Sequence, residues 1–279
     1  MNSAVKATPN APIGLFDSGI GGLSILKALR AEMPHESFVY FADSAHNPYG
    51  DKSDAFVIAR SMSITQQLID QHHIKALVVA CNTATAAAIH VLRADYPSLP
   101  IIGVEPALKP AVAVSQTKRI AVLATRGTLH SAKFLALKAS LAIQAEFICT
   151  PCDGLADLIE NHTLADNTTD LIAACAVFTG TTGRFGNQNA DIDTLVLGCT
   201  HYPLVLQHFQ AALRNAGGDG VQIVDNGHAV ARQVARQITS TALSSPQPPD
   251  TALVQTQPKL TLVSSGFAKH LHSAAARWL

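Results

Sequence analysis

The sequence predicts an α/β protein built from two linked lobes, each with a parallel sheet. Short runs rich in β-branched residues alternate with helix-length segments, which is typical of parallel strands covered by helices on both faces. Nine such runs exceed what a single doubly wound sheet comfortably holds. Leu77–Ala88 (LVVACNTATAAA) also has an echo at Leu195–Leu206 (LVLGCTHYPLVL), and a fainter echo pairs Leu15–Gly22 with Val224–Ala231. Together these repeats predict two pseudo-symmetric halves.

The predicted elements alternate regularly along the chain. Strands are expected at Ile13–Phe16, Phe38–Ala42, Leu77–Ala80, Ile101–Val104, Ile120–Ala124, Phe147–Cys149, Leu195–Leu197, Ile223–Asp225 and Leu260–Val263. Helices are expected at Leu23–Glu32, Asp54–Gln71, Thr85–Asp95, Ser131–Leu141, Asp170–Thr179, Leu204–Asn215 and Ala229–Thr239. Exposed loops or tails without an assigned function are expected at residues 1–11, Gly180–Ala190 and Ser244–Gln257.

The composition excludes several classes of protein. A chain of 279 residues, 48% of them hydrophobic, is long enough for a proper core. Its 20 Lys and Arg residues balance 20 Asp and Glu residues, and aromatic residues make up 5%, so neither the basic excess nor the stacking surface of a nucleic-acid binder is present. No segment has the apolar length of a signal peptide or a membrane span. We therefore expect a soluble, cytoplasmic protein that binds neither nucleic acid nor a membrane.

Two of the five cysteines occupy the place where chemistry is expected. Cys81 and Cys199 each follow a predicted strand and open a helix. Ligands of parallel α/β proteins bind beyond the carboxyl ends of the strands, where helix N–H groups lower the pKa of a thiol from about 8.5. A single cysteine in this setting is most often a small buried hydrophobic residue. Two of them, each followed by polar residues, favour a reactive pair. These polar residues are Asn82, Thr83, Thr200 and His201.

The other three cysteines lack this setting. Cys149 and Cys152 form a lone CTPC segment without a second pair of zinc ligands, which leaves a thioredoxin-like redox site as the alternative. Cys175 lies in the apolar run LIAACAVF and is expected in the core. No lysine or cluster of ligands in the sequence demands pyridoxal phosphate or a metal.

The segment LFDSGIGGLS admits a second interpretation, a dinucleotide-binding loop. Gly19 and Gly21 follow a strand and open a helix, and Asp43 ends the next strand, where an acid that binds ribose would lie. The third glycine of that fingerprint is replaced by Ser24, however. A nicotinamide-dependent dehydrogenase would also leave Asp17–Ser18 and the cysteine pair without a role.

Seven segments, in the same order, resemble the glutamate racemases of bacterial cell-wall synthesis, in the aspartate/glutamate racemase superfamily. They are IGLFDSGIGGLSIL, FADSAHNPYG, VVACNTATAAA, GVEPALKPA, LATRGT, LVLGCTHYPL and VDNGHAVA. The resemblance implies two Rossmann-like lobes with the active site in the cleft between them, and no cofactor or metal. It implies that L-glutamate and D-glutamate are interconverted, which supplies D-glutamate for peptidoglycan synthesis. The first lobe is expected to comprise residues 1–100 and 214–279, and the second residues 101–213. The oligomeric state stays open, a homodimer included.

The resemblance also implies roles for individual residues. Cys81 and Cys199 are the acid/base pair, with Cys81 taking the α-proton from D-glutamate and Cys199 taking it from L-glutamate. The residues that assist them are Asp17, His201 and Glu160, the last by a looser match in CDGLADLIE. The residues that hold the substrate are Asp17, Ser18, Tyr49, Gly50, Asn82, Thr83, Thr200 and His201.

Two thiols suit a racemase because one proton must leave one face of the α-carbon while another reaches the opposite face. The sequence also allows functions other than glutamate racemisation. An aspartate racemase or an arylmalonate-type decarboxylase of the same superfamily would keep most of the scaffold, although the decarboxylase needs only one cysteine. A ligand-binding α/β module that leaves the α-proton in place is the alternative of a different class.

Overall fold

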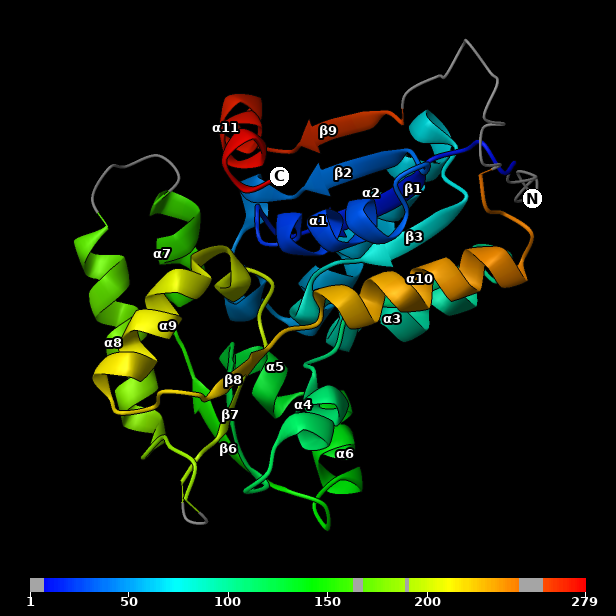
Figure 1. The fold of residues 1–279 in the computed structure, drawn as a ribbon. Coiled ribbons are helices and arrows are strands. Elements are labelled where there is room, and N and C mark those ends of the chain that lie inside the picture. The colour runs from blue at the N-terminus through cyan, green and yellow to red at the C-terminus, as the bar shows by residue number, and fades with distance from the viewer. Residues whose placement is uncertain (1–7, 163–167, 189–190, 246–257) are drawn as a thin grey trace, which may run out of the picture.

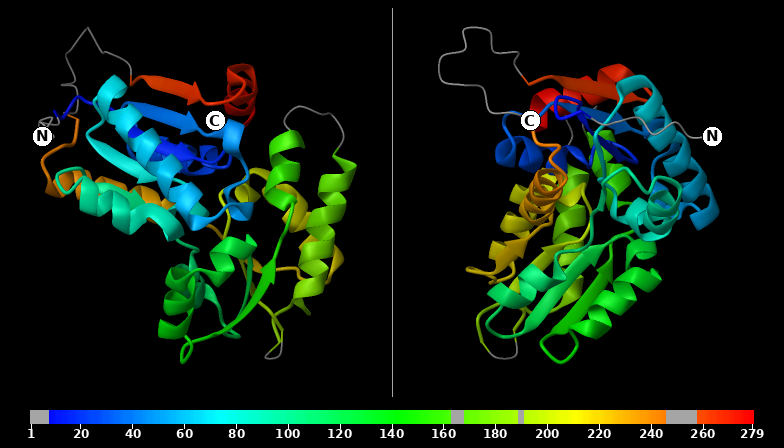
Figure 2. Two further views of the ribbon diagram at one scale, coloured as in Figure 1. Left: turned by 180° about the vertical axis from the view of Figure 1, so that it is seen from behind. Right: turned by 90° about the vertical axis from the view of Figure 1, so that its right-hand side faces the viewer.

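The structure, a computed structural model, describes residues 8–162, 168–188, 191–245 and 258–279. These residues form two α/β lobes, which lie one above the other in Figure 1 and are seen from two further directions in Figure 2. Every strand pairing in the two sheets is parallel, as the sequence predicts. Each predicted strand is present, with ends within two residues of those expected.

The first lobe contains a five-stranded sheet in the order β4-β3-β1-β2-β9. Its strands are β1 (Ile13–Asp17), β2 (Phe38–Ala42), β3 (Ala76–Val79), β4 (Ile101–Gly103) and β9 (Leu260–Ser264). Its helices are α1 (Leu23–Glu32), α2 (Asp54–His72), α3 (Asn82–Asp95), α10 (Gly227–Ser240) and α11 (Ala268–Trp278).

Successive side chains of each strand point to opposite faces of the sheet, so this lobe has two separate hydrophobic layers. Leu15, Tyr40 and Val78 belong to the layer that includes buried residues of α1, α10 and α11. Their neighbours Phe16 and Val79 belong to the layer formed with α2 and α3. Because both faces are covered, the strands read as nearly continuous apolar runs.

The second lobe contains a four-stranded sheet in the order β6-β5-β7-β8. Its strands are β5 (Arg119–Ala124), β6 (Glu146–Pro151), β7 (Thr194–Leu197) and β8 (Gln222–Val224). Its helices are α4 (Leu108–Val114), α5 (Arg126–His130), α6 (Ala132–Ser140), α7 (Leu155–His162), α8 (Thr169–Thr182) and α9 (Leu206–Asn215). Short 3₁₀ turns cover Ser44–His46, Tyr49–Asp51 and Tyr202–Val205.

The chain crosses between the lobes later than the sequence suggests. The expected boundaries, 1–100 with 214–279 and 101–213, separate β4 and β8 from the sheets in which they lie. Both are edge strands that hydrogen-bond to β3 and β7, respectively, and each completes its sheet before the chain leaves. The crossings therefore fall between β4 and α4 and between β8 and α10.

Four helices were not anticipated: α4, α5, α7 and α11. The first three contain only five to eight residues each, too short for a clear 3.6-residue periodicity. The fourth, α11, contains 11 residues and buries Leu271, Ala274 and Ala275, a spacing from which the sequence could have predicted it. None of the four helices changes the predicted strand order along the chain.

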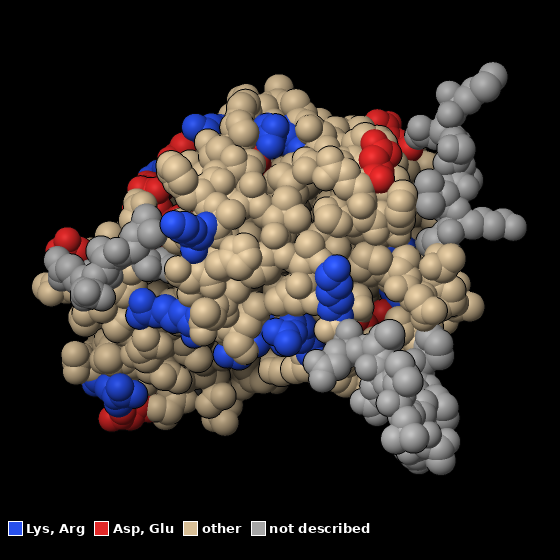
Figure 3. Space-filling view, turned by 90° about the horizontal axis from the view of Figure 1, so that it is seen from above, with Lys and Arg blue, Asp and Glu red and all other residues tan. Residues whose placement is uncertain are grey.

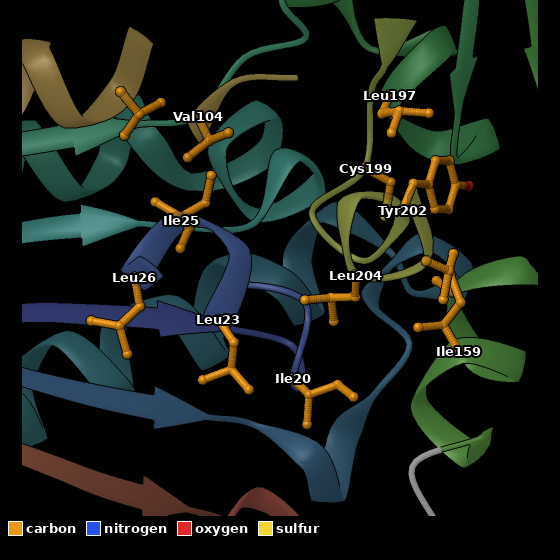
Figure 4. Close-up of a cluster of buried hydrophobic side chains, with 14 of the residues drawn as sticks. Ile20, Leu23, Ile25, Leu26, Val104, Ile159, Leu197, Cys199, Tyr202 and Leu204 are labelled. Carbon is orange, nitrogen blue, oxygen red and sulfur yellow. The ribbon is translucent and has the colours of Figure 1, made fainter. Parts of the chain in front are cut away.

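One hydrophobic cluster runs through both lobes and joins them. It includes Ile20 and Leu23 beside β1, and Ile159, Tyr202 and Leu204 of the second lobe. Figure 4 shows these side chains gathered between the two lobes, with Leu204 near Leu23 and Ile20. All five are at most 5% exposed, so this contact is as dry as the core of either lobe.

The three segments expected to be loops are only partly described. Helix α8 extends to Thr182, and Phe185 forms an isolated bridge with Ile192, so the stretch from residue 180 is more ordered than predicted. Most of residues 1–11 and 244–257 lies outside the described residues. Ser245 is described, and its N–H and hydroxyl groups donate to the carboxylate of Glu36.

The surface carries charges of both signs. On the face seen in Figure 3, Lys and Arg side chains and Asp and Glu side chains are scattered among uncharged residues, and several of opposite charge lie next to each other. In the described part of the chain, no helix combines the length and the apolar character needed to cross a membrane.

Candidate active site

Cys81 and Cys199 occupy equivalent turns in the two lobes. Cys81 follows β3 and is the N-cap residue of α3, where its Sγ atom lies 3.5 Å from the N–H group of Ala84. Cys199 follows β7 through Gly198, and its Sγ atom lies 3.8 Å from Nδ1 of His201. The exposed fractions of the two cysteines are 6% and 7%. Both thiols therefore lie at carboxyl ends of strands and are almost closed off from solvent.

Both cysteines line one narrow cavity, to which each lobe contributes. The first lobe supplies Asp17, Ser18, Asn47, Pro48, Tyr49, Gly50, Cys81, Asn82 and Thr83. The second lobe supplies Thr125, Thr128, Ala156, Cys199, Thr200 and His201. The structure thus brings together both cysteines and all eight residues expected to hold the substrate. Glu160 does not line the cavity.

Asp17 links the two lobes at the floor of the site. Its Oδ1 atom accepts the N–H group of Ser18 at 2.6 Å, and its Oδ2 atom accepts the hydroxyl of Thr200 at 2.9 Å. The residue is completely buried. Burial raises the pKa of Asp17 above its ordinary value, although His201 and these hydrogen bonds oppose the rise.

Glu160 acts on the cavity through His201. Its Oε2 atom lies 2.8 Å from Nε2 of His201, and its two oxygens accept the N–H group of Ile20 at 3.2 and 3.0 Å. Burial opposes a charge on His201, but its contacts with Cys199 and Glu160 raise the pKa of its imidazole well above the ordinary value. Burial likewise opposes ionisation of Glu160, yet the bond to His201 leaves its pKa lowered. The pair is therefore a carboxylate and an imidazolium, and the imidazolium adjoins Cys199.

The surroundings of Cys81 differ from those predicted. Burial raises the pKa of the Cys81 thiol well above its ordinary value, and the neighbouring carboxylate of Asp17 raises it further. The N–H group of Ala84 lowers this pKa, as expected at a helix N-terminus, but by less than burial raises it. Cys81 is therefore held as a thiol.

Asp43 cannot serve as an acid that binds ribose, which removes the main support for the dinucleotide interpretation. Its carboxylate is completely buried and accepts two hydrogen bonds from Arg60, at 2.9 and 2.7 Å, and one from the Tyr49 hydroxyl at 2.6 Å. Burial opposes its ionisation, but these bonds hold the pKa of Asp43 below its ordinary value. The carboxylate thus anchors Tyr49 at the wall of the cavity.

The two glycines of the apparent fingerprint have a different purpose. A Cβ atom on Gly19 would collide with the carboxylate of Glu160, and one on Gly21 would collide with the imidazole of His201. Glycine is needed because side chains of the second lobe pack directly against this backbone. The segment is the contact between the lobes.

Sequence reasoning missed two hydroxyl groups in the cavity, those of Thr125 and Thr128. Thr125 follows β5 and caps α5, and its hydroxyl lies 3.0 Å from that of Thr128 and 3.4 Å from that of Thr83. The rule that located the cysteines, polar residues directly after a strand, also applies to Thr125 and could have found it.

The remaining cysteines stand apart from the cavity lining. Cys149, Cys152 and Cys175 are free thiols, and Cys175 is completely buried in α8, as predicted. Burial raises the pKa of both Cys152 and Cys175 to about 12, so neither is a reactive thiolate. Among the described residues, no group of three or more His, Cys, Asp or Glu side chains is arranged to hold a metal ion.

Comparison with known proteins agrees with this geometry. Residues 23–234 match the Asp/Glu/hydantoin racemase family. A glutamate racemase of Ralstonia nicotianae is 45% identical over 236 residues, which cover 84% of this chain and 80% of the relative. A glutamate racemase of Cupriavidus pinatubonensis is 44% identical over 274 residues, covering 96% of this chain and 92% of the relative.

Solved structures give the same result. The glutamate racemase isoform RacE1 of Bacillus anthracis superimposes with a TM-score of 0.81 at 28% identity, over 97% of this chain and 94% of its own. Escherichia coli glutamate racemase, solved in complex with L-glutamate and the activator UDP-MurNAc-ala, superimposes with a TM-score of 0.77 at 27% identity, over 96% and 95% of the two chains. The chain therefore belongs to the Asp/Glu/hydantoin racemase family and is an isomerase of the glutamate racemase type.

Proposed function

We propose that the enzyme interconverts L-glutamate and D-glutamate by passing α-protons to and from Cys81 and Cys199, without a cofactor. The observation that carries this proposal is that two thiols, one from each lobe, line a single cavity. Two thiols that flank a bound α-carbon would each reach one of its two faces. A site for decarboxylation, or for binding alone, has no need of the second thiol.

L-glutamate is converted to D-glutamate by two proton transfers. The Cys199 thiolate takes the α-proton, and the Cys81 thiol delivers its own proton to the opposite face. The product is D-glutamate, with Cys199 protonated and Cys81 ionised, and exchange with solvent restores the starting state. With D-glutamate the same two steps run in reverse.

The neighbours of the two cysteines suit the direction from L-glutamate to D-glutamate. Because burial and Asp17 raise the pKa of Cys81, this thiol holds the proton that it must donate. The imidazole of His201 lies 3.8 Å from Cys199 and, when protonated, places a positive charge beside the sulfur that takes the α-proton. A positioned acid or base typically contributes about 10²–10⁴-fold to the rate, so substrate orientation must supply the rest.

The other residues of the cavity bind the two ends of the amino acid. We assign the α-carboxylate to donors from Asn82, Thr83 and Thr200 at the starts of the helices, since these can stabilise the charge that develops on deprotonation. The ammonium group faces Asp17 and Ser18. The side-chain carboxylate falls to the remaining donors, namely Tyr49, Gly50, Thr125 and Thr128.

The experiment that tests this function is chiral analysis of L-glutamate and L-aspartate after incubation with the purified enzyme in deuterium oxide. We expect D-glutamate that carries deuterium at the α-carbon, and little D-aspartate. Aspartate as the preferred substrate would contradict the assignment of the side-chain site. A decarboxylated product, or tight binding without α-proton exchange, would contradict racemisation itself.

The same proposal gives the enzyme a place in the cell. D-glutamate made in the cytoplasm would supply peptidoglycan synthesis, so cells depleted of the enzyme should need external D-glutamate to keep their shape. The proposed partner is glutamate alone, and sedimentation of the enzyme with and without glutamate will decide whether it acts as a homodimer.

A further inference from the structure

We propose that Asn226 is a positioning residue that turns the side-chain amide of Asn82 so that its NH₂ group faces the substrate carboxylate. The identity of that ligand rests on the function proposed above. Asn226 belongs to the segment VDNGHAVA, none of whose residues is among those expected to act in the site. Its side chain does not line the cavity, but it is hydrogen-bonded to Asn82, which does.

Asn226 lies where the chain crosses between the lobes. It precedes α10, at the return to the first lobe, and is 2% exposed. Its Nδ2 atom donates to the carbonyl oxygen of Glu105 at 2.9 Å. Glu105 lies between β4 and α4, where the chain leaves the first lobe. One side chain thus ties the two crossing segments together.

The bond to Glu105 determines which end of the Asn226 amide faces which partner. The nitrogen and oxygen ends of an asparagine amide have nearly the same shape, so their partners decide the orientation. A backbone carbonyl can only accept, so the atom facing Glu105 must be Nδ2. The same Nδ2 lies 3.4 Å from Oδ1 of Asn82. Because an amide nitrogen cannot accept a hydrogen bond, Asn82 must present its oxygen to Asn226.

The nitrogen of Asn82 is left to face elsewhere. It is buried and has no hydrogen-bond partner among the described residues, although Asn82 lines the cavity. A buried donor without an acceptor is unfavourable, and a carboxylate is an acceptor at every position. If the amide were reversed, its oxygen would face the carboxylate and repel it. Asn226 therefore acts on substrate affinity through the orientation of Asn82.

The test compares Asn226→Ala and Asn226→Asp with the wild-type enzyme. Asn226→Ala frees the amide of Asn82, and we expect KM for both enantiomers to rise roughly threefold to tenfold, which is the worth of one hydrogen bond, while kcat stays within about twofold. Asn226→Asp supplies only acceptors and favours the reversed amide, so we expect a larger rise in KM. If the aspartate variant fails to fold, the alanine variant still decides the matter.

Controls separate positioning from a structural role. In an Asn82→Ala background, Asn226→Ala should leave KM unchanged, because no amide remains to be oriented. Arg93→Met also removes side-chain bonds to a backbone carbonyl near this crossing, that of Ile101, without touching the cavity, and should leave KM unchanged. Equal KM effects of Asn226→Ala in the two backgrounds, or a loss of kcat alone, would overturn the proposal.

A second measurement keeps this inference separate from the proposed function. The side-chain NH₂ signals of Asn82, assigned by their loss in Asn82→Ala, should shift on addition of glutamate in the wild-type enzyme and not in Asn226→Asp. A wild-type enzyme that binds glutamate without racemising it would contradict the proposed function and leave this expectation intact. Unchanged Asn82 signals in an active enzyme would contradict the role of Asn226.

Discussion

The two proposed half-sites, one around Cys81 and one around Cys199, share a backbone design and differ in their electrostatics. Each places a cysteine after a parallel strand and at or near the start of a helical segment. Cys81 adjoins the buried carboxylate of Asp17, whereas Cys199 adjoins the imidazolium of His201, which Glu160 holds in place. The fold therefore places the two sulfurs in similar backbone settings, while different charged neighbours surround them: burial and Asp17 raise the pKa of Cys81, and His201 adjoins Cys199.

The largest expected effect comes from removing either sulfur. Cys81→Ala and Cys199→Ala should each lower racemisation by about 10²–10⁴-fold or more, because one face of the α-carbon loses its acid or base. The rate of D-glutamate or L-glutamate formation, measured by chiral chromatography, checks this. Normal racemisation by either variant would contradict the two-thiol mechanism.

Serine variants sharpen the same comparison. Enantiomers have an equilibrium constant of one, so kcat/KM must fall equally in both directions and cannot distinguish the two sulfurs. The α-deuterium isotope effect can distinguish them. Cys199→Ser should increase the isotope effect most with L-glutamate, and Cys81→Ser should increase it most with D-glutamate, because the replaced sulfur is the one that takes the α-proton from that enantiomer. Equal isotope effects for both substrates would contradict the assignment of the faces.

A steric change should disturb the Cys199 half-site alone. In Gly21→Ala the new methyl group must displace the imidazole of His201. We expect a loss in kcat of up to about 10²-fold, the effect of a displacement of about 1 Å at a reacting group. Gly180→Ala, in α8, is the matched control, since a Cβ atom there meets nothing within 4 Å. Full activity of Gly21→Ala would show that the contact with His201 has no catalytic role.

Breaking the Glu160–His201 pair should lower both activity and stability. Glu160→Gln removes a charged hydrogen bond of about 1.5–3 kcal/mol, so we expect kcat/KM to fall roughly tenfold to a hundredfold. The raised pKa of His201 adds stability that is complete below 6.5, its unfolded value, and is lost as pH rises through the folded pKa. The lowered pKa of Glu160 adds stability that is complete above 4.5 and is lost as pH falls through the folded pKa.

The difference in Tm between the wild type and Glu160→Gln should therefore be largest between pH 4.5 and 6.5 and should shrink at both extremes. Thermal unfolding at several pH values checks this window. A difference that does not change with pH would mean that the pair is not ionised.

Removal of metal ions is expected to have no effect on the rate. Dialysis against EDTA should leave the rate of both half-reactions unchanged, and the purified enzyme should lack pyridoxal absorbance, because the proposed chemistry uses only the two sulfurs and their neighbours. Adding back divalent metals is the control. A large loss of activity on dialysis that added metal restores would show that the enzyme needs a metal ion, and would contradict a reaction that uses only the two sulfurs and their neighbours.

The local pattern of apolar and polar residues was enough to predict much of the fold. The strands are continuous runs of β-branched residues because both faces of each sheet are covered, and all nine were predicted within two residues. The short helices α4 and α5 were missed because five to seven residues carry little periodicity. The lobe boundaries were missed because membership of β4 and β8 depends on which strand each one pairs with.

By itself, the sequence determined the strand order along the chain, the two strand–cysteine–helix turns and the residues that follow each cysteine. These features are local, because each depends on side chains a few positions apart. Only the tertiary structure decided that Glu160 contacts the site through His201 and that the carboxylate of Asp43 accepts hydrogen bonds from Arg60. It also decided that burial raises the pKa of the Cys81 thiol. A pKa and a hydrogen-bond partner depend on groups brought together from distant segments, so no local pattern contains them.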